Sequence, residues 1–266
     1  AAAWRRLSAD PEVRRWTSGA VSFSVTGEVV PSNSAVNADG SRKPGDGNLP
    51  GAVEHDFFVA STIEEMLESR CAMHLGAIGA EGTVVPDAVC PLGTATKSNG
   101  RQRLLHDGRP VNEGIDPGVL SLETLSRMRH VFKRHGFLIL ADCSAAYWHA
   151  GVTWESSMLL GFAFRGHYFC WLVLPFGINE APRIFCKLTD AVFAAWRASC
   201  PIPYEDRADM VVGGVAWDSG RPAPESPCGD VAHLGPGREG LVYIDDLGLA
   251  PPTVRLGRWW SVEGLL

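Results

Sequence analysis

Short apolar runs separated by polar turns recur along the chain, and several of them predict strands of a sheet. Residues 137–141 form a run typical of a buried strand, which ends at Asp142. Residues 240–250 hold two further runs on either side of Asp245 and Asp246, a pattern that predicts a strand, an acidic turn and a strand. Strands are also expected at 167–174 and within 88–105, where Asn99-Gly100 indicates a hairpin turn.

Apolar residues at helical spacing predict three helices. The first is expected to begin at residues 61–64, where Ser-Thr-Ile-Glu has the pattern of a capping box. The second covers 122–132, with Gly136 at the position of its C-cap. The third follows Asn179, which can cap it, and carries Pro182 in its first turn.

Two stretches lack this patterning. Residues 1–50 are poorly patterned, and 31–50 are rich in Ser, Asn, Gly, Asp and Pro, the composition of a flexible linker. Order is therefore expected to begin near Val53. Residues 199–240 alternate Pro and Gly with charged residues, and they are interpreted either as a mostly irregular insertion or as translated non-coding sequence from a faulty gene model.

Composition narrows the class of protein. At 266 residues and 45% hydrophobic, the chain is able to bury one substantial core or two modest ones. No apolar run is long enough for a membrane span, and the N-terminus lacks the layout of a signal peptide. The seven cysteines include no Cys-x-x-Cys pair, which argues against a disulfide framework and a zinc site and favours a reducing, intracellular setting in cytoplasm or nucleus. Since the chain does not begin with Met, it is expected to be a fragment of a longer polypeptide.

Charge is unevenly distributed. The chain has a net charge of −6, but residues 97–135 hold eight basic and four acidic residues, a local net of +4. Such a patch is able to bind phosphates while the rest of the chain stays acidic. A solvated charged face is the simpler interpretation of the same pattern.

Carboxylates at the ends of apolar strands are the candidate chemistry. Asp142 and the pair Asp245 and Asp246 occupy such positions, and carboxylate oxygens suit hard divalent cations. Two-metal phosphoryl transfer requires at least two converging carboxylates. The alternative is that Asp245 and Asp246 merely form a hairpin turn, where Asp is common.

The neighbours of these carboxylates carry a resemblance to reverse transcriptases. Tyr243-Ile244-Asp245-Asp246 resembles the Tyr-x-Asp-Asp box of that family, and residues 142–149 resemble its first palm motif. Leu174-Pro175-Phe176-Gly177 is similar to the family's Leu-Pro-Phe-Gly segment. The stretch 160–168 and the fingers-like stretch 91–112 are also similar to the family, and all blocks stand in family order. Retroviral enzymes have Gln at the position of Phe176. With Phe at this position, the segment resembles that of a gypsy-like or DIRS-like retrotransposon.

The resemblance implies an α+β polymerase right-hand fold made of fingers plus palm, an antiparallel sheet with packed helices, with no thumb. The expected domains are an N-terminal extension at 1–50, fingers at 51–136 and palm at 137–266, interrupted at 199–240 and truncated after the Tyr-x-Asp-Asp hairpin. The resemblance also implies two Mg²⁺ ions as cofactors. The partners it implies are an RNA or DNA template with its primer, deoxynucleoside triphosphates and the remainder of a retroelement polyprotein. No membrane partner is expected.

Individual roles follow from the matched motifs. Asp142 and Asp245 would bind both magnesium ions, with Asp246 beside them, and Tyr147 matches the aromatic gate that crowds a ribose 2′-hydroxyl. The residues matched to nucleotide binding are Lys97, Arg103, Tyr147, Phe176 and Gly177. Tyr147 is alternatively a core aromatic, and Lys97 and Arg103 taken singly are ordinary surface charges.

Departures from the family pattern keep other functions open. Gly108 replaces a large apolar residue, Cys143-Ser144 lacks the common Lys, and after Ala250 neither a primer grip nor a thumb is recognisable. The alternative to an active RNA-directed DNA polymerase is therefore an inactive retroelement remnant that keeps the fold and at most weak nucleic-acid binding. Another magnesium-dependent nucleotidyltransferase on a similar palm is a third hypothesis, which the fingers-like stretch argues against.

Overall fold

The structure is a computed structural model of the 266-residue chain. It describes residues 10–23, 25–26, 32–120, 139–142, 145–198, 211–212, 215–216, 240–243 and 246–249; residues 139–142 and those after 192 are described as backbone only.

Contacts divide the chain into two compact units. The first unit contains Asp10–Val119 and Ala145–Ile184, and the second contains Leu120–Ser144 and Phe185–Leu266. The sequence predicted a boundary at residue 136, with everything after it in the palm. In the structure, strands within 145–184 pair with strands from the first half of the chain, and the assignment of these parts to fingers and palm stays a prediction.

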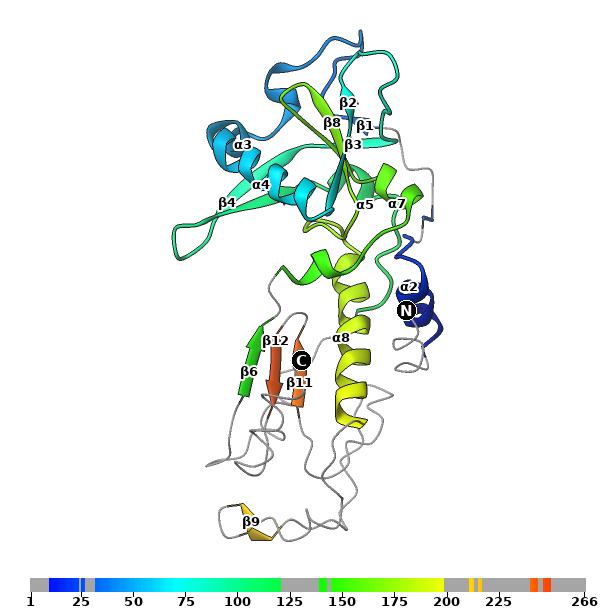
Figure 1. Ribbon diagram of the computed structural model, residues 1–266, viewed down its shortest axis with the longest axis vertical. Coiled ribbons are helices and arrows are strands. Elements are labelled where there is room, and N and C mark those ends of the chain that lie inside the picture. The colour runs from blue at the N-terminus through cyan, green and yellow to red at the C-terminus, as the bar shows by residue number, and fades with distance from the viewer. Residues whose placement is uncertain are drawn as a thin grey trace. The chain divides into compact units, whose positions relative to one another are not determined.

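A five-stranded sheet forms the centre of the first unit (Figure 1). Its order is β1-β3-β7-β8-β2, with parallel pairing from β1 through β7 and antiparallel pairing from β7 through β2. The strands are β1 (Ser32–Asn33), β2 (Ala72–Ala77), β3 (Ala88–Cys90), β7 (Gly161–Phe164) and β8 (His167–Trp171). Strand β7 is buried along its whole length, and Phe162 stacks on Phe169 of β8. The predicted strand at 167–174 is thus confirmed at β8, although the strand ends at Trp171.

A separate antiparallel hairpin joins β4 (Leu92–Thr96) to β5 (Gln102–His106). Its turn is closed by the Lys97 amide donating to the Arg101 carbonyl and by the Gly100 amide donating to the Lys97 carbonyl. Gly100 has φ +80°, a conformation that glycine adopts without strain. The hairpin that Asn99-Gly100 predicted is confirmed.

Helices of the first unit are short. They are α2 (Pro11–Ser18), η1 (Pro44–Gly47), α3 (Pro50–Glu54), α4 (Asp56–Glu68), α5 (Arg109–Asn112), η2 (Ala146–His149) and α7 (Trp154–Met158). Helix α4 begins five residues before the predicted capping box, so Ser61 is internal to it and donates to the Phe58 carbonyl. The expected start at Ser61 was wrong because a serine hydroxyl inside a helix is equally able to bond a preceding carbonyl.

The segment predicted to be a flexible linker is instead packed. Ala35 is fully buried in the core of the sheet, and Asp46 is 2% exposed. The Asp46 carboxylate accepts from the Arg42 side chain and from the Gly166 amide, which ties the segment to the β7–β8 turn. The low apolar content of this segment was misleading because side-chain hydrogen bonds, together with the buried Ala35, attach it to the sheet.

The second unit contains a three-stranded antiparallel sheet, in which β6, β12 and β11 lie side by side (Figure 1). These strands are β6 (Ile139–Asp142), β11 (Gly240–Tyr243) and β12 (Asp246–Leu249), which confirms the strand before Asp142 and the two strands at 240–250. Within 199–239 the structure describes only β9 (Val211–Val212) and β10 (Val215–Ala216), which pair with each other. The helix predicted at 122–132 lies outside the described residues.

Helix α8 (Ala181–Ala198) is the longest helix that the structure describes, and it carries Pro182 in its first turn as predicted. Its apolar residues Ile184, Phe185 and Ala191 are buried. Among the described residues, none of the helices combines the length and the apolar character needed to cross a bilayer.

Candidate active site

The strand ends of the second unit bring two predicted metal-binding residues to neighbouring positions. Strands β6 and β12 are antiparallel, and Asp142 is the direct partner of Asp246 in their register. Directly opposite residues in such a pair have Cα atoms about 4.5–5.5 Å apart. Two acidic residues far apart in sequence therefore meet at one point of the sheet. Asp245 lies outside the described residues.

Three of the predicted nucleotide-binding residues form a continuous stack in the first unit. The Arg103 guanidinium lies over the Phe176 ring, with 5.0 Å from Cζ to the ring centroid. Tyr147 also packs on the Phe176 ring, with centroids 4.7 Å apart and an interplanar angle of 38°. Tyr147 is 7% exposed, whereas Arg103 is exposed. The stack thus joins an exposed cation to a buried phenol through one half-buried aromatic ring.

Lys97 and Arg103 belong to the same hairpin. Lys97 is exposed at its turn, and Arg103 lies on β5 opposite Ala95 of β4. Because the hairpin positions both side chains on one short antiparallel ribbon, the two charges are presented together although only Arg103 contacts Phe176. Among the described residues, no interaction joins Lys97 to Arg103, Phe176 or Tyr147.

The loop that carries Phe176 approaches the end of β5 backbone to backbone. Gly177 has φ +116°, and a Cβ built on it would lie 1.9 Å from the His106 carbonyl oxygen. On the opposite side, a Cβ on Gly108 would lie 2.5 Å from the Gly177 carbonyl oxygen. Two glycines are therefore required for this contact. Gly108 departs from the family pattern, and in this chain the close Gly177 carbonyl leaves no room for a larger residue at that position.

A reciprocal pair of asparagines fixes the same loop, and the sequence did not reveal it. Asn112 Nδ2 donates to the Gly177 carbonyl at 2.8 Å, and Asn112 Oδ1 accepts from the Asn179 amide at 2.9 Å. In return, Asn179 Nδ2 donates to the Asn112 carbonyl at 3.0 Å. Asn179 was predicted to cap α8, but its Oδ1 is buried without a partner among the described residues. Its side chain serves the contact between α5 and the loop instead.

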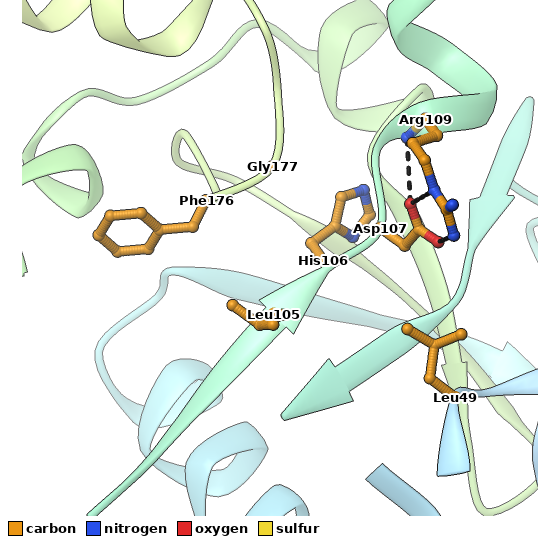
Figure 2. Close-up of a pocket in the computed structure, with 7 residues that line it drawn as sticks. All are labelled: Leu49, Leu105, His106, Asp107, Arg109, Phe176 and Gly177. Atoms are coloured by element: carbon orange, nitrogen blue, oxygen red, sulfur yellow. Dashed lines mark hydrogen bonds and ion pairs between the residues drawn. The ribbon is translucent and has the colours of Figure 1, made fainter. Parts of the chain in front are cut away.

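A cavity of about 320 Å³ lies beside this loop (Figure 2). On one wall, Asp107 and Arg109 face each other and form a two-pronged ion pair of 2.6 and 2.8 Å. The hydrogen bonds from Arg109 hold the pKa of the Asp107 carboxyl below its ordinary value. The cavity is lined by Leu49, Leu105, His106, Asp107, Arg109, Phe176 and Gly177.

His106 is the one buried titratable residue in this lining. It is 3% exposed, and neither ring nitrogen has a hydrogen-bond partner among the described residues. Burial lowers the pKa of its imidazole to about 4, since a charged ring would lose its solvation there. His106 is therefore neutral near pH 7 and packs edge-on to Trp171, with ring centroids 6.3 Å apart.

Metal-binding groups of three or more His, Cys, Asp or Glu side chains are not found among the residues whose side chains the structure describes. The side chains of Asp142, Asp245 and Asp246 are outside that set. For Asp142 and Asp246 of the second unit, the structure thus gives the strand register. For Arg103, Phe176 and Tyr147 of the first unit, it gives side-chain contacts.

Sequence relatives of the chain are viral polyproteins. No protein-family model matches the chain. It is 26% identical over 113 residues to the enzymatic polyprotein of Cauliflower mosaic virus (strain Strasbourg), a match that covers 42% of the chain and 16% of the polyprotein. It is 31% identical over 87 residues to the Gag-Pol polyprotein of Walleye dermal sarcoma virus, covering 32% of the chain and 5% of that polyprotein. The matches therefore span only a small part of these relatives.

Solved structures with a similar fold are foamy virus proteins. The foamy viral protease-reverse transcriptase in complex with double-stranded DNA matches with a TM-score of 0.52 at 16% identity, over 85% of this chain and 31% of that one. The native protease-reverse transcriptase of Prototype Foamy Virus matches with a TM-score of 0.52 at 19% identity, over 88% of this chain and 24% of that one. The chain thus has an α+β fold like that of reverse transcriptase structures.

Proposed function

We propose that this chain is the fingers and most of the palm of a reverse transcriptase, which adds deoxynucleotides to a primer 3′-hydroxyl on an RNA or DNA template. The observation that carries the proposal is the direct pairing of Asp142 with Asp246 in the β6–β12 register. The pairing brings together the Asp142 segment and the Tyr-x-Asp-Asp segment. The sequence had shown only that each segment resembles a motif of the family.

Carboxylates at this position have a defined task in the proposed reaction. The primer 3′-oxygen loses its proton to water and forms a bond to the α-phosphorus, while the bond from that phosphorus to the bridging oxygen breaks and pyrophosphate leaves. Two Mg²⁺ ions, when bound, neutralise the charge that develops on the phosphate oxygens. Asp142, Asp245 and Asp246 would hold these ions, because carboxylate oxygens are the ligands that Mg²⁺ prefers.

The stack in the first unit supplies the nucleotide contacts of the proposal. Arg103 presents a planar fork that suits bidentate phosphate binding, and its cation–π contact with Phe176 limits the positions of that fork. Lys97 on the same hairpin adds a second positive charge for the triphosphate. Phe176 and Gly177 are assigned to contact with the new base pair.

The wider context is part of the same proposal. The matched relatives are viral polyproteins, and one matched structure is a complex with double-stranded DNA. These likenesses support a template–primer duplex as ligand and a longer polyprotein as the natural setting. Placement in a gypsy-like or DIRS-like element rests on Phe176 alone and stays a prediction.

Primer extension separates this proposal from an inactive remnant. With an RNA template, a DNA primer, deoxynucleotides and Mg²⁺, the proposal predicts extension that chelation by EDTA abolishes. A remnant would bind the duplex in a manner that weakens steeply with salt, yet would leave the primer unextended where a related enzyme extends it. That second result would contradict the proposed activity.

Tyr147→Ala is expected to reduce discrimination against ribonucleotides. Because Tyr147 packs on Phe176, loss of its ring opens space for a 2′-hydroxyl beside the nucleotide contacts. The ratio of kcat/KM for deoxynucleotides to that for ribonucleotides should fall by roughly 10- to 100-fold, the range that pocket-size changes of this kind give. Tyr147→Phe keeps the ring and should retain the wild-type ratio. An unchanged ratio in Tyr147→Ala, in a variant that circular dichroism shows to be folded, would assign Tyr147 to the core alone.

A further inference from the structure

Two histidines on adjacent strands of the first unit bring their ring nitrogens into contact. His74 lies on β2, and His167 begins β8. The two rings share a hydrogen bond of 3.0 Å between His74 Nε2 and His167 Nδ1, in which one nitrogen donates and the other accepts. His74 is exposed and His167 is half-buried, so the two nitrogens are accessible from solvent.

The sheet holds this arrangement in place. In the antiparallel register of β2 and β8, His74 is the partner of Phe169 and Ala77 is the partner of His167, with a bulge between His74 and Gly76. The two histidines therefore occupy diagonal positions across the strand pair. The Phe169 ring lies against His74, with centroids 5.2 Å apart, which restricts the imidazole on its inner side.

The spacing of the nitrogens selects a class of ligand. Metal–imidazole bonds are about 2.0–2.1 Å long, so two nitrogens 3.0 Å apart subtend an angle of about 90–100° at a shared ion. That angle is close to the cis angle of square-planar or octahedral coordination and is smaller than a tetrahedral angle. Tetragonal sites with nitrogen ligands suit Cu²⁺ and Ni²⁺, whereas tetrahedral sites suit Zn²⁺.

We propose that His74 and His167 form a two-histidine site for a divalent transition-metal ion with tetragonal preference, Cu²⁺ or Ni²⁺. The ion replaces the proton of the shared hydrogen bond: the donor ring moves its proton to its other nitrogen, and each neutral ring then binds through the nitrogen that faces its partner. No third His, Cys, Asp or Glu joins them among the side chains that the structure describes, so water completes the coordination. Since β2 is the edge strand of the sheet, a bound ion would link this edge to β8.

The site differs in chemistry from the carboxylates of the second unit. Mg²⁺ is a hard ion that prefers oxygen ligands, and imidazole pairs do not compete for it. Binding of Cu²⁺ or Ni²⁺ to the histidines is therefore independent of the proposed polymerase activity. The two proposals can fail separately.

The test uses the full chain, freed of any histidine tag, titrated with NiCl₂ in a calorimeter at about pH 7.5, where an ordinary imidazole is neutral. Since the chain has eight histidines, variants are needed to assign the site. His74→Gln and His167→Gln should each weaken Ni²⁺ binding by more than about tenfold, because even loss of an outer-shell partner has that effect. Ni²⁺ should also raise the melting temperature of the wild type but not of these variants.

His55→Gln is the matched control, since His55 is half-buried in the same unit and outside this strand pair. It should bind Ni²⁺ as the wild type does. Wild-type affinity in both glutamine variants would overturn the proposal. So would the absence of binding at about 1 mM Ni²⁺, a concentration that detects even weak sites. Melting curves recorded without metal show whether each variant is folded.

Discussion

Asp142→Asn is expected to reduce primer extension by at least about a thousandfold. Metal-assisted phosphoryl transfer derives several kcal/mol of transition-state stabilisation from its ions, and about 4 kcal/mol corresponds to that factor in rate. An amide at residue 142 removes one negative charge from the position that faces Asp246 across the strand pair. The loss should appear in single-turnover rates at saturating Mg²⁺, where weak metal binding is not limiting.

Stability distinguishes this effect from misfolding. Like charges directly opposite each other in an antiparallel pair are destabilising, so the metal-free Asp142→Asn variant should be as stable as the wild type or more so, by about 0.2–1 kcal/mol. Asp87→Asn, at an exposed position in the first unit, is the matched change and should retain full extension. Extension by Asp142→Asn within about tenfold of the wild type would remove Asp142 from the catalytic set.

Gly177→Ala is expected to destabilise the first unit by about 3 kcal/mol or more. The new Cβ would lie 1.9 Å from the His106 carbonyl oxygen, and φ at this residue is +116°, so both sterics and backbone conformation oppose alanine. The obstacle is backbone rather than a flexible side chain, and relief requires the loop to move away from β5. Urea denaturation followed by circular dichroism measures the change in the free energy of unfolding.

Two further glycines separate the causes. Gly79 has φ +81°, and a Cβ added there would meet nothing within 4 Å, so Gly79→Ala tests the backbone conformation alone and should cost only about 1 kcal/mol. Gly108→Ala tests the steric contribution alone, since φ at Gly108 is −74° and its Cβ would lie 2.5 Å from the Gly177 carbonyl oxygen. If Gly177→Ala costs no more than Gly79→Ala, the close contact between the loop and β5 does not exist in solution.

The position of Phe176 depends on the same contact. Its ring receives Arg103 on one side and Tyr147 on the other, while the loop behind it is held by Asn112 and by the two glycines. Gly108 was a reason to suspect a decayed copy when only the sequence was considered. In the structure it is complementary to Gly177, and a larger residue there would displace the loop. Gly108 is therefore explained by packing, while primer extension is what separates an active enzyme from a remnant that keeps the fold.

Local pattern was sufficient for the elements that carry the candidate chemistry. The strand that ends at Asp142, the two strands around Asp245 and Asp246 and the hairpin at Asn99-Gly100 were all predicted. Each depends on residues that are neighbours in sequence: a strand-sized apolar run, or a turn residue that tolerates positive φ. The start of α4 and the capping residue of α8 were predicted less well, because Ser and Asn bond other backbone groups as readily as they cap a helix.

What the sequence by itself determined is therefore the set of elements, the order of the motifs and the residue types placed at the strand ends. Only the tertiary structure decided that Asp142 is paired with Asp246, that Arg103 and Tyr147 both contact Phe176, and that the segment 32–50 contributes strand β1 and the buried Ala35 to the sheet. The physical reason is the range of the interactions. Turn chemistry and apolar periodicity act within a few residues, whereas strand register, glycine-to-backbone contact and buried hydrogen bonds join segments that are distant in the chain.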